Sequence, residues 1–320
     1  MDKPLTGNQT EKGQPRSILV TGAHRSGTTW VGKMLAANDQ IGYISEPLNV
    51  WHRPGVMRTP VKHWYTYICK DNEEIFSKGF EETLSFQYHT TKEIQSLKSI
   101  KDIIRMARDW NTFSKGRIKG QRVLVKDPFA VFSSLWFFKR FGFDIVITVR
   151  HPAAIASSLK RLNWSFDFSD LLEQPLLIRD LLSPFYDELV EMVVSPGDVI
   201  EQSCLLWRMI YATVASFQEQ QPKFIILRHE DIAKNPIEEF CNVYGFLGVD
   251  FTPQVEWAIK NSSSEKNPNE APRRIRHSYH LNSKANLEKW KQRLDLEEIA
   301  RVRELTADVS PFFYTEKDWE

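Results

Sequence analysis

Short, uninterrupted apolar runs recur along this chain, and longer stretches with helical spacing of apolar residues separate them. Such runs are typical of strands that are buried on both faces of a parallel sheet. The intervening helices are long enough for right-handed crossovers, which is the pattern of a doubly wound α/β sheet. We therefore predict an α/β fold whose parallel sheet is flanked by helices on both faces. The strands are expected at Ile18–Gly22, Arg122–Lys126, Phe143–Arg150 and Lys223–Arg228, with a shorter candidate at Ile41–Ser45.

The same pattern predicts a leader followed by a single domain. Residues 1–16 contain few apolar side chains and are expected to form a flexible leader, so the domain covers residues 17–320. Two insertions with helical spacing, about residues 51–120 and 163–203, interrupt the α/β pattern. We expect them either to form a lid or acceptor wall, or to pack on the sheet.

Composition narrows the class of protein and of ligand. The chain has 42% hydrophobic and 26% charged residues, as ordinary globular proteins do, and 12% aromatic residues, which predict aromatic walls around a cavity or a core. Its formal net charge of +1 indicates no nucleic acid partner, so any anion site depends on a local cluster of arginines. No apolar run is long enough to span a membrane, and the three cysteines are far apart. These features predict a cytoplasmic protein.

A glycine-bounded loop follows the first predicted strand and opens a helix. Gly22 and Gly27 have the spacing of the phosphate-binding loop G-x-x-x-x-G-K-[S/T], but Thr28 occupies the lysine position. Backbone N–H groups at the start of a helix, with the hydroxyls of Thr28 and Thr29, favour a phosphate. Arg25 adds a guanidinium, which clamps an anion through two hydrogen bonds. A tight strand-to-helix turn is the alternative interpretation.

A second anion site is predicted, apart from the first, where the strand before Arg150 ends. Pro152 suits the first turn of the next helix, and Ser158 lies about two turns into it. Because side chains on a helix lean toward its N-terminus, Ser158 can reach an anion held by Arg150. An exposed ion pair on a solvated helix is the alternative. Two such sites at neighbouring strands favour a nucleotide with phosphates at its 5′ and 3′ positions.

At these motifs the chain resembles sulfotransferases that use 3′-phosphoadenosine 5′-phosphosulfate (PAPS), in the style of soluble bacterial and carbohydrate-type members. Arg25–Trp30 (RSGTTW) resembles their 5′-phosphosulfate loop, and Val149–Leu159 (VRHPAAIASSL) resembles their 3′-phosphate motif. Similar segments continue in matching order at Leu124–Phe132, Ile226–Pro253 and Asn286–Leu305. The resemblance implies a P-loop-like sulfotransferase fold. It also implies direct, metal-independent transfer of the sulfuryl group to an acceptor hydroxyl, with 3′-phosphoadenosine 5′-phosphate (PAP) as product.

The resemblance also assigns residues to the nucleotide. It places Arg25 near the bridging oxygen of PAPS. Trp30 falls where some cytosolic members stack an aromatic ring on the adenine, and a core position is the alternative. The resemblance places Arg150 and Ser158 on the 3′-phosphate. The residues implied around the 5′-phosphosulfate are Ser26, Gly27, Thr28 and Thr29.

The acceptor hydroxyl must lose a proton, so a general base is expected beside it. Glu46 is favoured, because Tyr43–Asn49 (YISEPLN) resembles the stretch in which carbohydrate sulfotransferases have a glutamate as proposed base. Asp127 is the second candidate, because cytosolic hormone and phenol sulfotransferases place a catalytic histidine in the comparable segment, where this chain has none. Lys126 is expected to be a supporting cation. An acidic turn residue is the alternative interpretation of Glu46.

Cytosolic sulfotransferases cover the nucleotide with an R-K-G loop that this chain lacks. Arg273 and Lys284, in the polar C-terminal loop, are the candidates to replace it, and a solvated charge cluster is the alternative.

Two rival functions stay open at this point. One is a P-loop kinase or nucleotide triphosphatase, which the threonine at the lysine position argues against. The other is a nucleotide-binding protein without catalytic activity. For the proposed enzyme we expect a small-molecule or carbohydrate acceptor, and no metal.

Overall fold

The computed structural model describes residues 16–221, 223–270 and 279–320, and within them five parallel strands form one sheet in the order β2-β3-β1-β4-β5. The predicted leader lies outside this description except for its last residue. All five predicted strands are confirmed, and they are β1 (Ile18–Gly22), β2 (Ile41–Ser45), β3 (Arg122–Lys126), β4 (Asp144–Val149) and β5 (Ile225–Arg228). Strand β5 begins later than predicted, because its pairing with β4 starts at Ile225.

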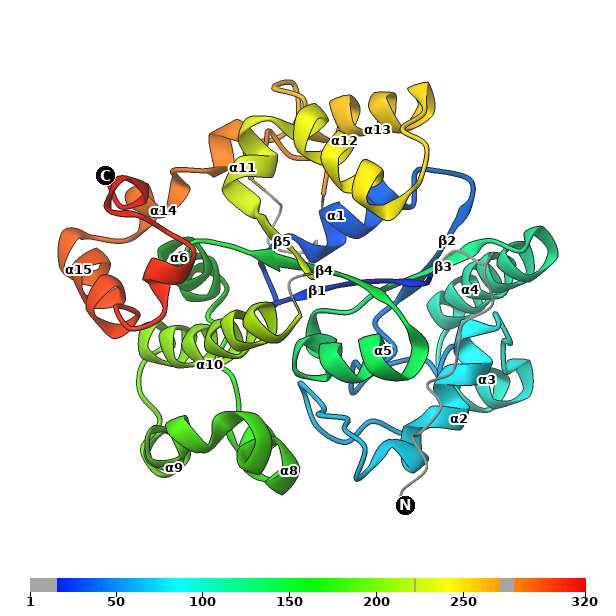
Figure 1. Cartoon of the computed structure of the whole chain (residues 1–320), viewed down its shortest axis with the longest axis horizontal. Helices are drawn as coiled ribbons and strands as arrows, with labels where there is room; N and C mark the ends of the chain where they lie inside the picture. The colour runs from blue at the N-terminus through cyan, green and yellow to red at the C-terminus, as the bar shows by residue number, and fades with distance from the viewer. Residues whose placement is uncertain (1–15, 222, 271–278) are drawn as a thin grey trace, which may run out of the picture.

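Helices cover both faces of the sheet, as predicted (Figure 1). Ile18 and Val20 of β1 pack on one side against α1 (Thr28–Leu35), α12 (Pro236–Leu247) and α13 (Pro253–Ser263). Leu19, between them, packs on the other side with α5 (Ser134–Phe141) and α10 (Val199–Gln220). Because successive strand residues point to opposite faces, two covered faces require the uninterrupted apolar runs seen in the sequence.

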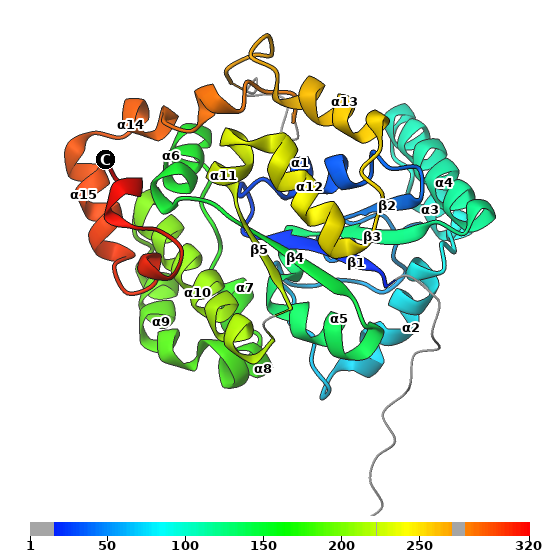
Figure 2. The ribbon, with the colours of Figure 1, turned by 45° about the horizontal axis from the view of Figure 1, so that its top comes forward.

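The predicted insertions contain most of the remaining helices. Residues 51–120 include α2 (Glu73–Leu84), α3 (Thr90–Ser96) and α4 (Ile100–Lys119), which lie beside the β2 edge of the sheet (Figure 2). Residues 163–203 include α7 (Ser169–Leu172), α8 (Pro175–Leu177) and α9 (Tyr186–Val194) and the start of α10. The other helices are α6 (Pro152–Leu162), α11 (His229–Lys234), α14 (Lys289–Arg293) and α15 (Leu296–Leu305). In the part of the chain that the structure describes, no helix has both the length and the apolar character to cross a bilayer.

Candidate active site

A cavity of about 260 Å³ lies at the carboxyl ends of the parallel strands. Its wall contains side chains that follow different strands, among them Glu46 after β2, Arg150 after β4 and His229 after β5. Ligands of open α/β sheets bind in this position, because loops from several strands converge there. The predicted site residues in the wall are Arg25, Gly27, Thr28, Thr29, Trp30, Glu46, Arg150 and Ser158.

The loop between β1 and α1 depends on glycine and on a buried serine. Gly22 has a φ of 143° and Gly27 a φ of 103°, a region that favours glycine. Ser26 is fully buried, and its Oγ donates to the carbonyl of Ala23 over 2.6 Å and lies 2.6 Å from Thr148 Oγ1. The side chain of Ser26 therefore supports the loop from within the protein, and Gly27 brings the start of α1 to the cavity.

The Gly22→Ala variant is expected to lose at least about 3 kcal/mol of unfolding free energy. A Cβ at Gly22 would lie 2.3 Å from the carbonyl oxygen of Thr148, which belongs to the neighbouring strand. Gly142→Ala is the matched control, because Gly142 also has a positive φ, 65°, but a Cβ there would meet none of the described atoms within 4 Å. The control is expected to lose only about 1 kcal/mol. Urea unfolding measures the unfolding free energy of both variants. Equal losses in the two variants would contradict the prediction that a Cβ at Gly22 clashes with Thr148.

The structure brings the two predicted anion sites into direct contact. Nε of Arg25 donates to Oγ of Ser158 over 3.1 Å, and Nη1 of Arg150 donates to the carbonyl of Arg25 over 3.0 Å. The sites are thus closer together than the motifs predict, because the Arg25 side chain reaches Ser158 on α6. One cavity therefore offers both sets of anion ligands.

Two further arginines, which the sequence motifs do not predict, complete a cationic cluster. Burial and the charges of Arg150, Arg161 and Arg293 lower the pKa of Arg25 to about 10. Arg161 and Arg293 both approach Oε1 of Glu270, at 3.1 Å and 2.5 Å. Arg161 follows Ser158 by three residues on α6, so helical spacing contained a signal for it. Arg293 comes from α14, and no local pattern indicates it.

His229, also missed, lies between the phosphate loop and Trp30. A Cβ added at Gly27 would lie 2.6 Å from Nδ1 of His229, and this nitrogen has no hydrogen-bond partner among the residues described. Burial lowers the pKa of His229 well below its ordinary value, so the imidazole is neutral. The Trp30 ring meets it edge-on at 5.8 Å, and Nε1 of Trp30 donates to Ser262 Oγ over 2.9 Å. Trp30 therefore belongs to both the core and the cavity wall.

Glu46 is held in one orientation at the cavity wall. Its backbone has a φ of 52°, which is uncommon for a residue other than glycine and is found more often at functional sites. Its carboxylate forms an ion pair with Lys126, whose side chain is buried, and accepts a hydrogen bond from Asn49 Nδ2 over 2.8 Å. These contacts leave the carboxylate fixed beside the cavity.

Asp127 has a different environment. It is fully buried, and its two carboxylate oxygens accept hydrogen bonds from the N–H groups of Leu48, at 2.6 Å, and Phe129, at 2.9 Å. Burial, with the charge of Glu46, raises the pKa of Asp127 to about 7. Asp127 is not among the described residues that line the cavity. Its contacts connect the loop after β2 to the segment after β3, which supports the position of Glu46.

Of the two candidates for a covering loop, Lys284 does not line this cavity. Lys284 is exposed and lines a separate surface hollow with His151 and Trp290. Arg273 lies outside the described residues. The described chain also contains no group of three or more His, Cys, Asp or Glu side chains that could hold a metal ion.

The outer part of the cavity is aromatic. Trp51 is 74% exposed although it lines the cavity, and it meets Trp64 edge-on at 5.1 Å. Trp164 also lines the cavity and lies against His24, with ring centroids 5.2 Å apart. These three tryptophans belong to the two predicted insertions. The insertions therefore contribute to the wall of the cavity.

The parallel sheet, with a glycine loop and a helix N-terminus at an arginine-lined cavity, defines a P-loop-like nucleotide-binding protein. Residues 15–310 match the Sulfotransferase domain family, and the chain belongs to this family. The family predicted from the motifs is thereby confirmed.

Similarity to individual proteins is more limited. Carbohydrate sulfotransferase 1 of Homo sapiens is 35% identical over 80 residues, 24% of this chain and 18% of that protein. Carbohydrate sulfotransferase 3 of Mus musculus is 31% identical over 70 residues, 22% of this chain and 14% of that protein. The match spans less than a fifth of the length of either relative. The sulfotransferase domain of the Synechococcus PCC 7002 olefin synthase has a TM-score of 0.46 and 15% identity, over 98% of this chain and 99% of that chain.

Proposed function

We propose that this chain transfers the sulfuryl group of PAPS to a carbohydrate hydroxyl, without a metal ion. The observation that carries the proposal is the cluster of Arg25, Arg150, Arg161 and Arg293 around the cavity of the phosphate loop. Glu270 sets one carboxylate against these four guanidinium groups, and a bound anion would reduce the repulsion between the like charges further. PAPS supplies negative charge at two positions, the 5′-phosphosulfate and the 3′-phosphate, which suits the two joined anion sites.

Arg25 and the start of α1 would act on the reacting end of the nucleotide. When the sulfur–oxygen bond to the phosphate breaks, negative charge develops on the departing phosphate oxygen. Backbone N–H groups at Gly27 and Thr28 and the Arg25 guanidinium, positioned there in advance, stabilise that charge more in the transition state than in the ground state. Arg150 and Ser158 would hold the 3′-phosphate.

Glu46 would accept the proton of the acceptor hydroxyl as that oxygen attacks the sulfur. A general base must lie within hydrogen-bond reach of the proton that it removes, and of the two predicted carboxylates Glu46 lines the cavity. The ion pair with Lys126 and the hydrogen bond from Asn49 would orient the carboxylate toward the acceptor.

The aromatic outer wall supports a carbohydrate acceptor. Trp51, Trp64 and Trp164 offer large, rigid apolar faces, while Glu46 and Asn49 offer polar atoms nearby. A sugar ring has apolar faces and a hydroxyl rim, so it matches this combination. The relatives named as carbohydrate sulfotransferases support the same acceptor class. The three cysteines that the structure contains as free thiols support a cytoplasmic location.

An acceptor panel with radiolabelled PAPS tests this function. Label is expected to pass to at least one carbohydrate acceptor, in preference to phenols, and the rate is expected to be unchanged in a chelator because no step requires a divalent cation. Unlabelled PAP, as control, should inhibit the transfer. Magnesium-dependent phosphoryl transfer from ATP would contradict the proposal, and PAP binding without transfer to any acceptor would indicate a noncatalytic protein.

A further inference from the structure

Helix α4 presents an exposed apolar stripe. Ile100, Ile104 and Ile118 are 78%, 65% and 84% exposed. Ile100 and Ile118 are separated by about five helical turns, and Ile104 lies one turn after Ile100, so the three side chains share one face. Trp110 is also exposed on this helix. Asn111 lies on this face between Ile104 and Ile118, so the stripe is interrupted. Single exposed apolar residues are ordinary, but several on one face of a helix indicate an interaction surface.

The stripe points away from the rest of the protein. The buried residues of α4 are Phe113 and Gly116, on the other side of the helix, and both pack against Phe86. Figures 1 and 2 show α4 on the outside of the molecule, beside the β2 edge of the sheet. The protein therefore uses one side of α4 for its own core and leaves the isoleucine side to solvent.

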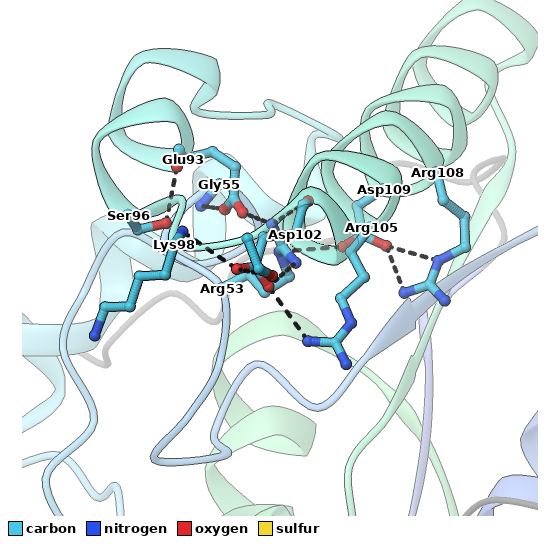
Figure 3. Close-up of polar contacts among 10 residues, drawn as sticks. Arg53, Gly55, Glu93, Ser96, Lys98, Asp102, Arg105, Arg108 and Asp109 are labelled. Carbon is cyan, nitrogen blue, oxygen red and sulfur yellow. Dashed lines mark hydrogen bonds and ion pairs between the residues drawn. The ribbon is translucent and has the colours of Figure 1, made fainter.

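The acidic residues of α4 face inward. Its two carboxylates, Asp102 and Asp109, approach Arg53 at 4.0 Å and 3.6 Å (Figure 3). Arg53 also forms an ion pair with the fully buried Glu93 of α3. This network fixes α4 in its rotation about its own axis. Asp102 and Asp109 also pair with Arg105 and Arg108 of the same helix, at 3.4 Å and 3.1 Å (Figure 3).

The basic residues of α4 face outward. The helix contains six Lys and Arg residues against two Asp, a net charge of +4, whereas the whole chain has a net charge of +1. All six basic residues are exposed, and they are Lys101, Arg105, Arg108, Lys115, Arg117 and Lys119. An exposed apolar stripe flanked by cationic side chains is the pattern of a helix that lies in a membrane interface.

We propose that α4 binds the surface of a membrane that contains anionic lipids, with Ile100, Ile104 and Ile118 inserted between the headgroups. Lipid phosphates would contact the flanking Lys and Arg side chains, and each basic side chain near such a surface adds to the attraction. A second copy of the chain is a less favourable partner for this stripe than an anionic membrane, because two helices of net charge +4 repel each other. The proposal does not depend on the reaction at the cavity.

Vesicle flotation of the full chain tests the proposal. The protein is expected to bind phosphatidylcholine vesicles that contain phosphatidylserine, to bind pure phosphatidylcholine weakly, and to dissociate as salt screens the charges. The double variant Ile100→Ser/Ile104→Ser is expected to lower the partition coefficient by about tenfold or more. Leu296→Ser is the matched control, because Leu296 is 84% exposed but lies on α15, at the opposite end of the molecule (Figure 1).

A second variant tests the charges. Lys101→Glu/Lys119→Glu leaves the stripe intact and is expected to reduce binding by about tenfold or more. Circular dichroism of each variant verifies that it is folded. The proposal is overturned if the wild type does not bind the anionic vesicles, or if the isoleucine variant binds them as well as the wild type. It is also overturned if sedimentation equilibrium shows self-association that the isoleucine substitutions remove, since the stripe would then be a dimer interface.

Discussion

Glu46→Gln is expected to lower kcat for sulfuryl transfer by about 10²- to 10⁴-fold, the usual contribution of a general base. Glutamine keeps the shape of the side chain and still accepts from Asn49, but it cannot take the acceptor proton. PAP affinity should change little, because the predicted nucleotide ligands within the described residues that line the cavity come from the loop after β1, the start of α1, the end of β4 and α6. Turnover with saturating PAPS and calorimetric PAP binding measure the two effects.

The substitution also leaves the buried Lys126 without its partner carboxylate. An unpaired buried charge destabilises the folded state, so thermal unfolding must be compared as well. The double variant Glu46→Gln/Lys126→Met removes both charges and should recover stability without recovering turnover. Recovery of turnover in the double variant would mean that the loss came from destabilisation and not from a missing base.

The Asp127→Asn variant tests which of the two carboxylates, Glu46 or Asp127, is the general base. An asparagine side chain has one acceptor oxygen, so either the Leu48 or the Phe129 N–H group would lose its partner, at a cost of about 1–3 kcal/mol of unfolding free energy. We expect this variant to lose stability and to keep most of its kcat below its unfolding temperature. If it loses kcat as strongly as Glu46→Gln is expected to, while Glu46→Gln remains active, the base is Asp127.

The fold could be predicted because its signals are local. Each strand is a continuous apolar run, since both faces of the sheet are covered, and each crossover contains helical spacing. The predicted start of β5 is less accurate, because it depends on where pairing with β4 begins. That register is a property of the neighbouring strand and is not encoded in the segment from Lys223 to Arg228.

The site could be predicted only in part. Arg25, Arg150 and Ser158 belong to motifs near strand ends, and adjacent strands bring them together. Arg293 and Trp51 reach the cavity from α14 and from an insertion, whose placement no local pattern gives. A sequence motif also does not show which way a side chain points. Two polar residues picked out by their motifs, Ser26 and Asp127, face the interior and the backbone.

Arg25→Met is expected to lower kcat by about 10²- to 10³-fold without lowering the stability of the free protein. The methionine retains much of the apolar stem but removes the charge that would stabilise the departing phosphate oxygen. Burial and the repulsion from Arg150, Arg161 and Arg293 lower the pKa of Arg25, which means that the charged guanidinium is disfavoured in the folded state. Removing it therefore relieves repulsion, and the unfolding temperature should stay constant or rise. Turnover and thermal unfolding of the same preparation measure both.

Arg150→Met is the matched control for Arg25→Met, because it removes one cation from the same cluster at the 3′-phosphate position. It should weaken PAP binding but not the binding of adenosine 5′-phosphate, which lacks the 3′-phosphate, whereas Arg25→Met should weaken both ligands. Arg25 would then act at the reacting end of the nucleotide, and Arg150 would select nucleotides that carry a 3′-phosphate. An Arg25→Met protein with wild-type kcat would contradict the role at the departing oxygen. A large drop in its unfolding temperature would instead show that Arg25 stabilises the fold through its contact with Ser158.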